Sequence, residues 1–140
     1  THQIVHLDFD WLRSSLLQSE DAFNPKDDPV IPGRNSILIS IGASIAMGRG
    51  SNLLFVGFNR NDDEVFPDCR PAYVRAINEV TLLQGGVHLV APLIGYTKRD
   101  IVRAGEKYNI DWSKTWSCYE GGKHPCGECG ACRERSTANV

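Results

Sequence analysis

Residues 52–59, NLLFVGFN, contain four consecutive apolar residues followed by a glycine. An apolar run without alternating polar residues is typical of a strand that is buried on both faces, and such strands occur mainly in parallel sheets. Residues 85–94, GGVHLVAPLI, have the same character and predict a second buried strand. The two stretches together favour an α/β fold.

A helix is predicted ahead of the first strand, over residues 35–48. Its apolar side chains recur at helical spacing and predict one inward-facing stripe, made of Ile37, Leu38, Ile41, Ile45 and Ala46. Gly48 and Gly50 then end the helix.

Two further helices follow the strands. Pro71 suits the first turn of a helix that we expect to continue to about Leu83, with an inner side formed by Val74, Ile77 and Val80. Thr97 is the predicted N-cap of the next helix, with Asp100 three residues later in a variant of the capping box.

The chain order is therefore strand, helix, long loop, helix, strand, helix, strand, helix and a cysteine-rich tail. The first three elements are the strand at residues 2–9, the helix at 11–18 and the loop at 19–33. This alternation predicts a doubly wound, mostly parallel α/β sheet of the Rossmann-like type. Such sheets bind ligands at the carboxyl ends of their strands, which points to residues 57–64 and 91–98.

The bulk properties of the 140 residues are those of a globular domain with room for a small appendage. We expect the division at residues 1–110 for the α/β domain and 111–140, called the tail below. The net charge of −2 gives no overall attraction to nucleic acid or to anionic membranes. No apolar run reaches the roughly 18 residues of a membrane span, and a reducing cytoplasm is the expected location. The chain lacks a starting methionine and begins within a predicted strand, so we expect a fragment.

The tail contains four of the five cysteines, in the pattern C-x7-C-x2-C-x2-C: Cys118, Cys126, Cys129 and Cys132. Disulfides are disfavoured where thiols stay reduced, and a redox pair needs only two cysteines. A four-thiolate zinc site is favoured, while an iron–sulfur cluster and merely reactive thiols stay open. A zinc ion held by all four sulfurs would be structural, since no position is left for water or substrate.

Other residues support this interpretation of the tail. Glycines follow Cys126 and Cys129, as in metal knuckles where the backbone turns back toward the sulfur. The cations that could offset the charge of the thiolates are Lys123, Arg133 and Arg135. Cys69, the fifth cysteine, is expected to be a small buried residue near a helix start, and a functional thiol is the less favoured alternative.

Four collinear segments resemble the 7-cyano-7-deazaguanine synthases of the QueC type. They are IPGRNSILISIGASIA (31–46), LLFVGFNRNDDEVFPDCRPAYVRAIN (53–78), APLIGYTKRDIVRAG (91–105) and TWSCYEGGKHPCGECGACRER (115–135). The resemblance implies an N-type ATP pyrophosphatase of the adenine nucleotide alpha-hydrolase type. It implies conversion of 7-carboxy-7-deazaguanine and ammonia to 7-cyano-7-deazaguanine, with ATP, Mg²⁺, a four-cysteine zinc site and a homodimer.

The resemblance also suggests which residues line the ATP and substrate cleft. Arg34 and Asn35 open a helix, where backbone N–H groups favour an anion. Asp68 could accept hydrogen bonds from the edge of a guanine-like ring, and Arg70 could hold a carboxylate with two parallel bonds. The structural alternatives are helix caps and a surface arginine.

Two more positions complete the expected cleft, and none of its residues is assigned a catalytic role. Lys98 begins a helix after a strand and could meet a phosphate, although a solvated lysine fits the same pattern. Gly57 suits close approach of the backbone to a nucleotide, or it simply ends its strand.

One family feature is missing from the 140 residues. The superfamily's phosphate loop, Ser-Gly-Gly-x-Asp-Ser, occurs nowhere in the sequence. Without that loop the pyrophosphate lacks its anion-binding nest. We therefore expect the chain as given to be inactive and its parent protein to be active.

Three other functions stay open at this point. A tRNA-thiolating ATP pyrophosphatase would use its cysteines to carry sulfur. A non-catalytic zinc module would bind RNA or a partner, although the basic and aromatic strip expected for RNA is missing and no direct nucleic-acid contact is predicted. A family member could also stop at the amide or act on a deazaguanine destined for DNA.

Overall fold

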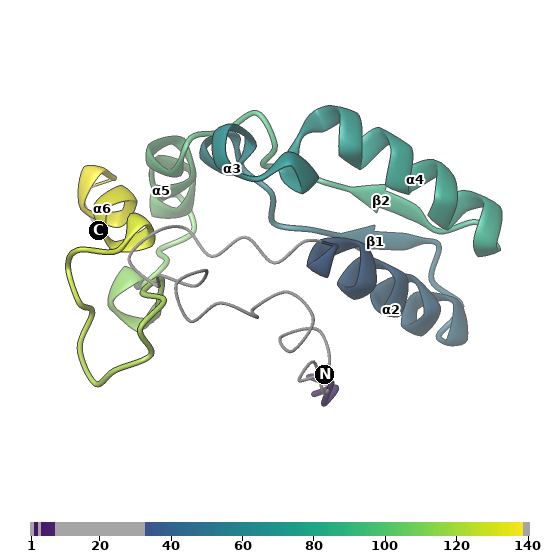
Figure 1. Ribbon diagram of the computed structural model, residues 1–140, viewed down its shortest axis with the longest axis horizontal. Helices are drawn as coiled ribbons and strands as arrows, with labels where there is room; N and C mark the ends of the chain where they lie inside the picture. The colour runs from purple at the N-terminus through teal and green to yellow at the C-terminus, as the bar shows by residue number, and fades with distance from the viewer. Residues whose placement is uncertain (1, 3, 8–32, 139–140) are drawn as a thin grey trace, which may run out of the picture.

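The computed structural model describes residues 2, 4–7 and 33–138 of the chain (Figure 1). The described elements are α2 (Arg34–Gly48), β1 (Leu53–Phe55), α3 (Arg60–Val65), η2 (Pro67–Cys69), α4 (Pro71–Gly85), β2 (His88–Val90), α5 (Lys98–Glu106), η3 (Trp112–Lys114) and α6 (Gly130–Thr137). Residues 2 and 4–7 form no strand. The rest of the predicted first strand, the predicted helix at 11–18 and nearly all of the loop at 19–33 lie outside the described residues.

The α/β prediction is confirmed by a parallel pair of strands. β1 and β2 pair in register, with Leu54 opposite Leu89. The two strands run between α4 on one side and α2 on the other, as Figure 1 shows. A parallel pair requires a crossover, and α3, η2 and α4 supply it between the two strands.

Helix α2 meets the sheet through small side chains. Its buried residues are Ile39, Ala43 and Ala46. A Cβ atom added at Gly42 would lie 3.1 Å from the Leu54 side chain, so the helix and β1 are in close contact. The predicted stripe was therefore wrong in its register: only Ala46 of that set is buried, and Leu38 is exposed. Because the helix and the strand lie so close together, small residues such as Ala43 and Ala46 occupy the inner face, and Leu38 lies outside it.

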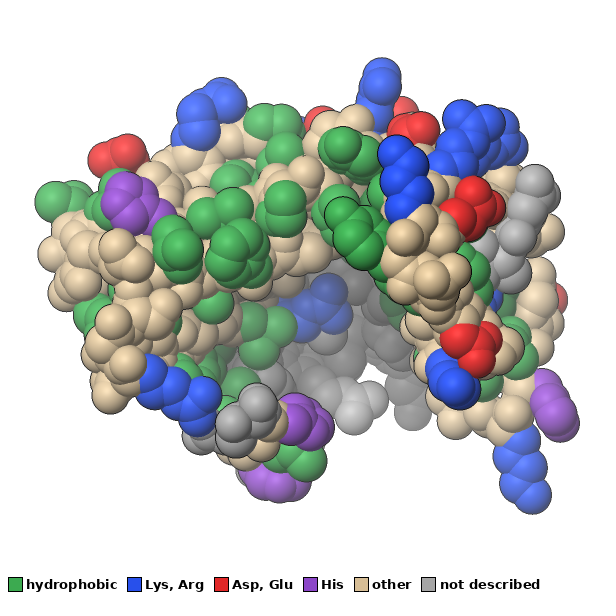
Figure 2. All heavy atoms as spheres, turned by 180° about the vertical axis from the view of Figure 1, so that it is seen from behind, with side chains coloured by type: hydrophobic (Ala, Val, Ile, Leu, Met, Phe, Trp, Pro, Cys, Tyr) green, Lys and Arg blue, Asp and Glu red, His purple; other side chains and the backbone are tan. Residues whose placement is uncertain are grey.

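The prediction that both strands are buried on both faces was wrong. Leu53 and Phe55 are exposed, and so is His88, whereas Leu89 is buried. Within the described part of the chain β1 pairs only with β2, so each strand has an unpaired edge along which side chains reach solvent. Figure 2 shows hydrophobic side chains gathered on the half of the molecule that holds the sheet and α4.

Helix α4 presents the predicted inner face only in part. Thr81 is almost fully buried, and its hydroxyl donates a 2.8 Å hydrogen bond to the carbonyl of Val87 at the start of β2. Val80, predicted to face inward, is exposed, while Ile77 is half-buried. Thr81 therefore takes the inward position that the apolar pattern assigned to Val80, because its hydroxyl binds the backbone of Val87.

The structure confirms one local prediction in the C-terminal half. The capping box at the start of α5 is complete, with hydrogen bonds in both directions between Thr97 and Asp100. The short helix α3 and the tail helix α6 were not predicted. No described helix has the length and apolar character needed to cross a bilayer.

Candidate metal centre and cleft

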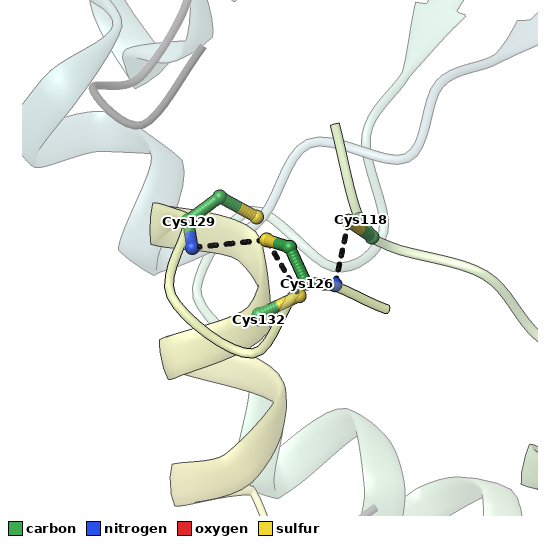
Figure 3. A group of neighbouring side chains, drawn as sticks. All are labelled: Cys118, Cys126, Cys129 and Cys132. Atoms are coloured by element: carbon green, nitrogen blue, oxygen red, sulfur yellow. Dashed lines mark hydrogen bonds between the residues drawn. The ribbon is translucent and has the colours of Figure 1, made fainter. Parts of the chain in front are cut away.

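The four tail cysteines form a compact cluster. Their Sγ atoms all lie within 4.8 Å of one another (Figure 3). The Sγ atoms of Cys126 and Cys132 are 3.9 Å apart, much longer than a disulfide bond. Zinc–sulfur bonds of about 2.3 Å in a tetrahedron place sulfurs about 3.8 Å apart, so the donor set fits zinc.

Local backbone geometry explains how the cluster forms. Gly127 has φ +79°, a conformation that favours glycine, and the turn it allows brings the N–H of Cys129 to 3.4 Å from the Sγ of Cys126. The N–H of Cys126 in turn donates to the Sγ of Cys118, also at 3.4 Å. Cys132 lies in the first turn of α6. Backbone donors aimed at the sulfurs favour thiolates over thiols.

The pKa values of two neighbouring thiols in the cluster are shifted in opposite directions. Burial opposes ionisation of Cys129, but hydrogen bonds from the backbone of Tyr119 and Cys132 and from neighbouring cysteines lower its pKa to about 7. Burial and the neighbouring cysteines raise the pKa of Cys132 to about 12. The raised pKa of Cys132 opposes ionisation of this thiol, and a bound divalent cation would supply the charge that favours the thiolate.

The tail is fastened to α5 by polar contacts. Lys98 forms an ion pair with Glu134 of α6, and Arg99 Nη2 donates to the carbonyl of Thr137 at 3.0 Å. Arg135 holds the other end of the tail, with Nη2 2.7 Å from the carbonyl of Trp112. Helix α6 thus joins the cysteine cluster to the helix that follows β2.

The loops at the carboxyl ends of β1 and β2 are bonded to each other. The N–H of Arg60 donates to the carbonyl of Tyr96 at 2.8 Å, and the N–H of Lys98 donates to Asn61 Oδ1 at 2.9 Å. Asn59 is buried and caps α3, and its amide donates to Asp62 Oδ2 at 2.5 Å. These bonds fix the sheet edge where α/β proteins bind ligands.

A cavity of about 200 Å³, called the cleft below, opens beside this edge. Its lining residues come from the start of α2, from the segment between β1 and α4, and from the tail: Arg34, Asn35, Phe58, Asp62, Phe66, Cys69 and Tyr119. Asn35 Nδ2 lies 3.6 Å from the Sγ of Cys69. Burial raises the pKa of Cys69 to about 11, and Asp62 and Asp68 act in the same direction, so this thiol stays neutral.

Comparison with known proteins decides the family. Residues 1–140 match the family described as "Queuosine biosynthesis protein QueC". The chain belongs to the QueC family. It is 41% identical to a 7-cyano-7-deazaguanine synthase of Thermoplasma acidophilum over 145 residues, covering 93% of this chain and 61% of the relative. A synthase of the same name from Prochlorococcus marinus is 36% identical over 152 residues, covering 98% and 68%.

This QueC chain spans only part of its relatives. A third synthase of that name, from Caldicellulosiruptor bescii, is 41% identical over 111 residues, which cover 78% of this chain and half of the relative. The chain therefore spans between half and about two thirds of the length of these curated relatives.

The predicted cleft residues of this QueC chain fall into two groups. Arg34 and Asn35 lie together at the start of α2 and line the cleft. Asp68 and Arg70 flank Cys69 but are not among the lining residues, and the Nε of Arg70 donates to the carbonyl of Asp63 at 3.2 Å.

The other two predicted positions lie apart from the cleft lining. Lys98 begins α5 and pairs with Glu134 of the tail. Gly57 follows β1, and a Cβ atom added there would meet nothing within 4 Å.

Four lining residues were not predicted from the sequence: Phe58, Asp62, Phe66 and Tyr119. The first two fall within residues 57–64, which the strand-end rule had indicated as a site without choosing among its members. Tyr119 carries no spacing signal of its own. Its one hint is its position directly after a metal-ligand candidate, Cys118.

Proposed function

We propose that the complete protein is an ATP-dependent carbon–nitrogen ligase that converts 7-carboxy-7-deazaguanine and ammonia to 7-cyano-7-deazaguanine. The observation that carries the proposal is the family match over residues 1–140, together with relatives of that name. The product lies on the route to queuosine or archaeosine, and the enzyme would act in the cytoplasm as a homodimer without direct contact to nucleic acid.

The reaction needs two activations of oxygen. A carboxylate reacts poorly with ammonia because its leaving group would be oxide. Attack of the carboxylate on the α-phosphate of ATP gives an acyl adenylate and releases pyrophosphate, and ammonia then displaces AMP to leave the amide. A second adenylation, on the amide oxygen, allows loss of a proton and AMP and forms the nitrile. Each activation consumes one ATP, and each oxygen leaves with an AMP.

Charge accumulates on phosphate in both activations, so positioning and fixed donors matter more than a general base. Arg34 and Asn35 are proposed to face the adenylate, since they open α2 beside the cleft. Asp68 and Arg70 are proposed to meet the ring and the carboxylate, Lys98 a phosphate, and Gly57 the nucleotide. Mg²⁺, when bound, neutralises phosphate charge.

Zinc is proposed to have a structural role at Cys118, Cys126, Cys129 and Cys132. A zinc ion bound by four thiolates has no open position for water or substrate. This closed geometry disfavours sulfur transfer by these cysteines, which the tRNA-thiolating alternative requires.

The test is turnover by the full-length protein. It should form 7-cyano-7-deazaguanine from the acid, ammonia, ATP and Mg²⁺, with AMP and pyrophosphate, as followed by liquid chromatography and mass spectrometry. The 140-residue chain alone should form none. Accumulation of the amide would assign the protein to a shorter reaction, and transfer of sulfur to tRNA would overturn the proposal.

A further inference from the structure

We propose that the metal centre positions Tyr119 as one wall of the cleft, where its ring contacts the planar heterocycle of the substrate. The choice of heterocycle rests on the proposed function. The coupling between metal and cleft rests on geometry alone. Under this proposal the cysteine cluster is structural in its chemistry but also shapes the binding site.

The cleft is built from two parts of the chain. Six of its seven lining residues lie between positions 34 and 69, and the seventh is Tyr119, fifty positions further on. Tyr119 directly follows Cys118, whose Sγ belongs to the metal cluster. A residue next to a metal ligand moves with it, so the tail closes a cavity that the α/β part leaves open.

Backbone contacts tie Tyr119 to the sulfurs on both sides. The N–H of Tyr119 donates to the sulfur of Cys129, and the N–H of Cys126 donates to the sulfur of Cys118. Trp116 Nε1 holds the carbonyl of Cys118 at 2.9 Å. No helix or strand includes residues 115–129, so these contacts and the metal itself define the path of this segment.

The lining suits a planar heterocycle. Phe58 and Phe66 offer apolar faces. Asp62 offers an acceptor for ring N–H groups in addition to Asp68, while Arg34 remains the proposed contact of the adenylate. Tyr119 is 41% exposed, so part of its surface can contact a ligand. Stacking on such a ring is insensitive to the details of the base and contributes substantially to affinity.

The first test needs no ligand. In the zinc-loaded full-length protein, alkylation of Cys69 by N-ethylmaleimide, followed by peptide mass spectrometry, reports access to the cleft. Tyr119→Ala should raise the rate severalfold while zinc content stays unchanged, and removal of zinc from the wild-type protein should do the same. Tyr108→Ala is the matched control, because Tyr108 is 79% exposed and does not line the cleft.

The second test measures binding of 7-carboxy-7-deazaguanine by calorimetry. Tyr119→Ala should raise the dissociation constant for the acid about tenfold, whereas Tyr119→Phe should bind it nearly as tightly as the wild type. The affinity for ATP should not change in either variant. An unchanged affinity in Tyr119→Ala would overturn the contact with the substrate.

The two tests separate this inference from the proposed function. If Cys69 reacts at the same rate in Tyr119→Ala and after zinc removal, the coupling is wrong whatever the substrate. Loss of zinc in Tyr119→Ala would also overturn it, because the tyrosine would then serve the metal site. If the wild-type protein does not bind the acid while Cys69 responds as expected, the proposed function is wrong. The role of Tyr119 in closing the cleft would still stand.

Discussion

The metal centre and the cleft are assembled in opposite ways. All four candidate ligands lie between positions 118 and 132, and local turns bring their sulfurs within 4.8 Å of one another. The cleft draws its residues from positions 34 to 119 and depends on the packing of helices, the sheet and the tail. A site with local geometry can be inferred from spacing, whereas a distributed site is known only once the fold is known.

The two regions also differ in what holds them. With a metal bound, the cysteine cluster would depend on the cation to offset the charge of its thiolates. The cleft lies beside loops that are held by hydrogen bonds, such as the contact of Arg60 with Tyr96. Substitutions can therefore perturb one region at a time.

The largest expected effect is that of Cys129→Ser. Cys129 is fully buried, and structural zinc sites contribute binding free energy on the order of 10 kcal/mol that is coupled to folding. The variant should lose most of its zinc, measured by atomic emission, and its tail should become sensitive to protease. Cys69→Ser, which changes a buried thiol that lines the cleft and lies outside the cluster, should keep its zinc. Full zinc content in Cys129→Ser would show that the four sulfurs do not share one ion.

Gly105→Ala should weaken the packing of α5 against the start of the tail. A Cβ atom at Gly105 would lie 2.3 Å from the Trp112 indole, at the contact of α5 with the start of the tail. Overpacking of this kind should lower the free energy of unfolding by about 3 kcal/mol, measured by urea denaturation.

Gly95→Ala is the control for that substitution, because a Cβ atom there meets nothing within 4 Å. It should change stability by less than about 0.5 kcal/mol. Equal effects of the two substitutions would mean that the packing of Trp112 does not hold the tail in place.

Alkaline pH should destabilise the cleft through Cys69. Burial, with Asp62 and Asp68, raises its folded pKa from 9.0 to about 11, so the unfolded state releases its proton first as pH rises. The stabilisation is present below pH 9 and is lost between pH 9 and 11, at a cost of about 2 kcal/mol. Chemical denaturation across this range should show the loss, and Cys69→Ser should flatten it. An identical slope in that variant would contradict the assignment.

The smallest expected effect concerns the ion pair between Lys98 and Glu134. Both side chains are about a third exposed, so a double-mutant cycle should give a coupling below about 1 kcal/mol. If Lys98 also meets a phosphate, Lys98→Ala should lower turnover of the full-length protein more than Glu134→Gln does. Equal losses would leave Lys98 with the structural role alone.

Local signals in the sequence were reliable. The capping box at Thr97, the turn at Gly127 and the cysteine cluster each depend on residues close in the chain, and the structure has all three. The parallel pairing of β1 with β2 was also confirmed, because apolar runs separated by a helical pattern leave few other topologies.

Patterns that depend on distant partners were less informative. The inner face of α2 is set by its close approach to Leu54, a partner that apolar spacing within residues 35–48 does not identify. Thr81 is buried because its hydroxyl meets the backbone of Val87, so a polar residue takes a position that hydrophobic periodicity assigns elsewhere. Tyr119 joins the cleft only because the tail docks beside it.

The short span of the cysteine cluster has a consequence for folding. Closing a chain segment of this length is fast, whereas pairing β1 with β2 requires the intervening helices to fold between them. We expect the tail to acquire its metal independently of the sheet, even in molecules whose sheet is misfolded. Zinc content would then be a poor measure of the fraction of a preparation that carries an intact binding site, and ligand titration would be the appropriate one.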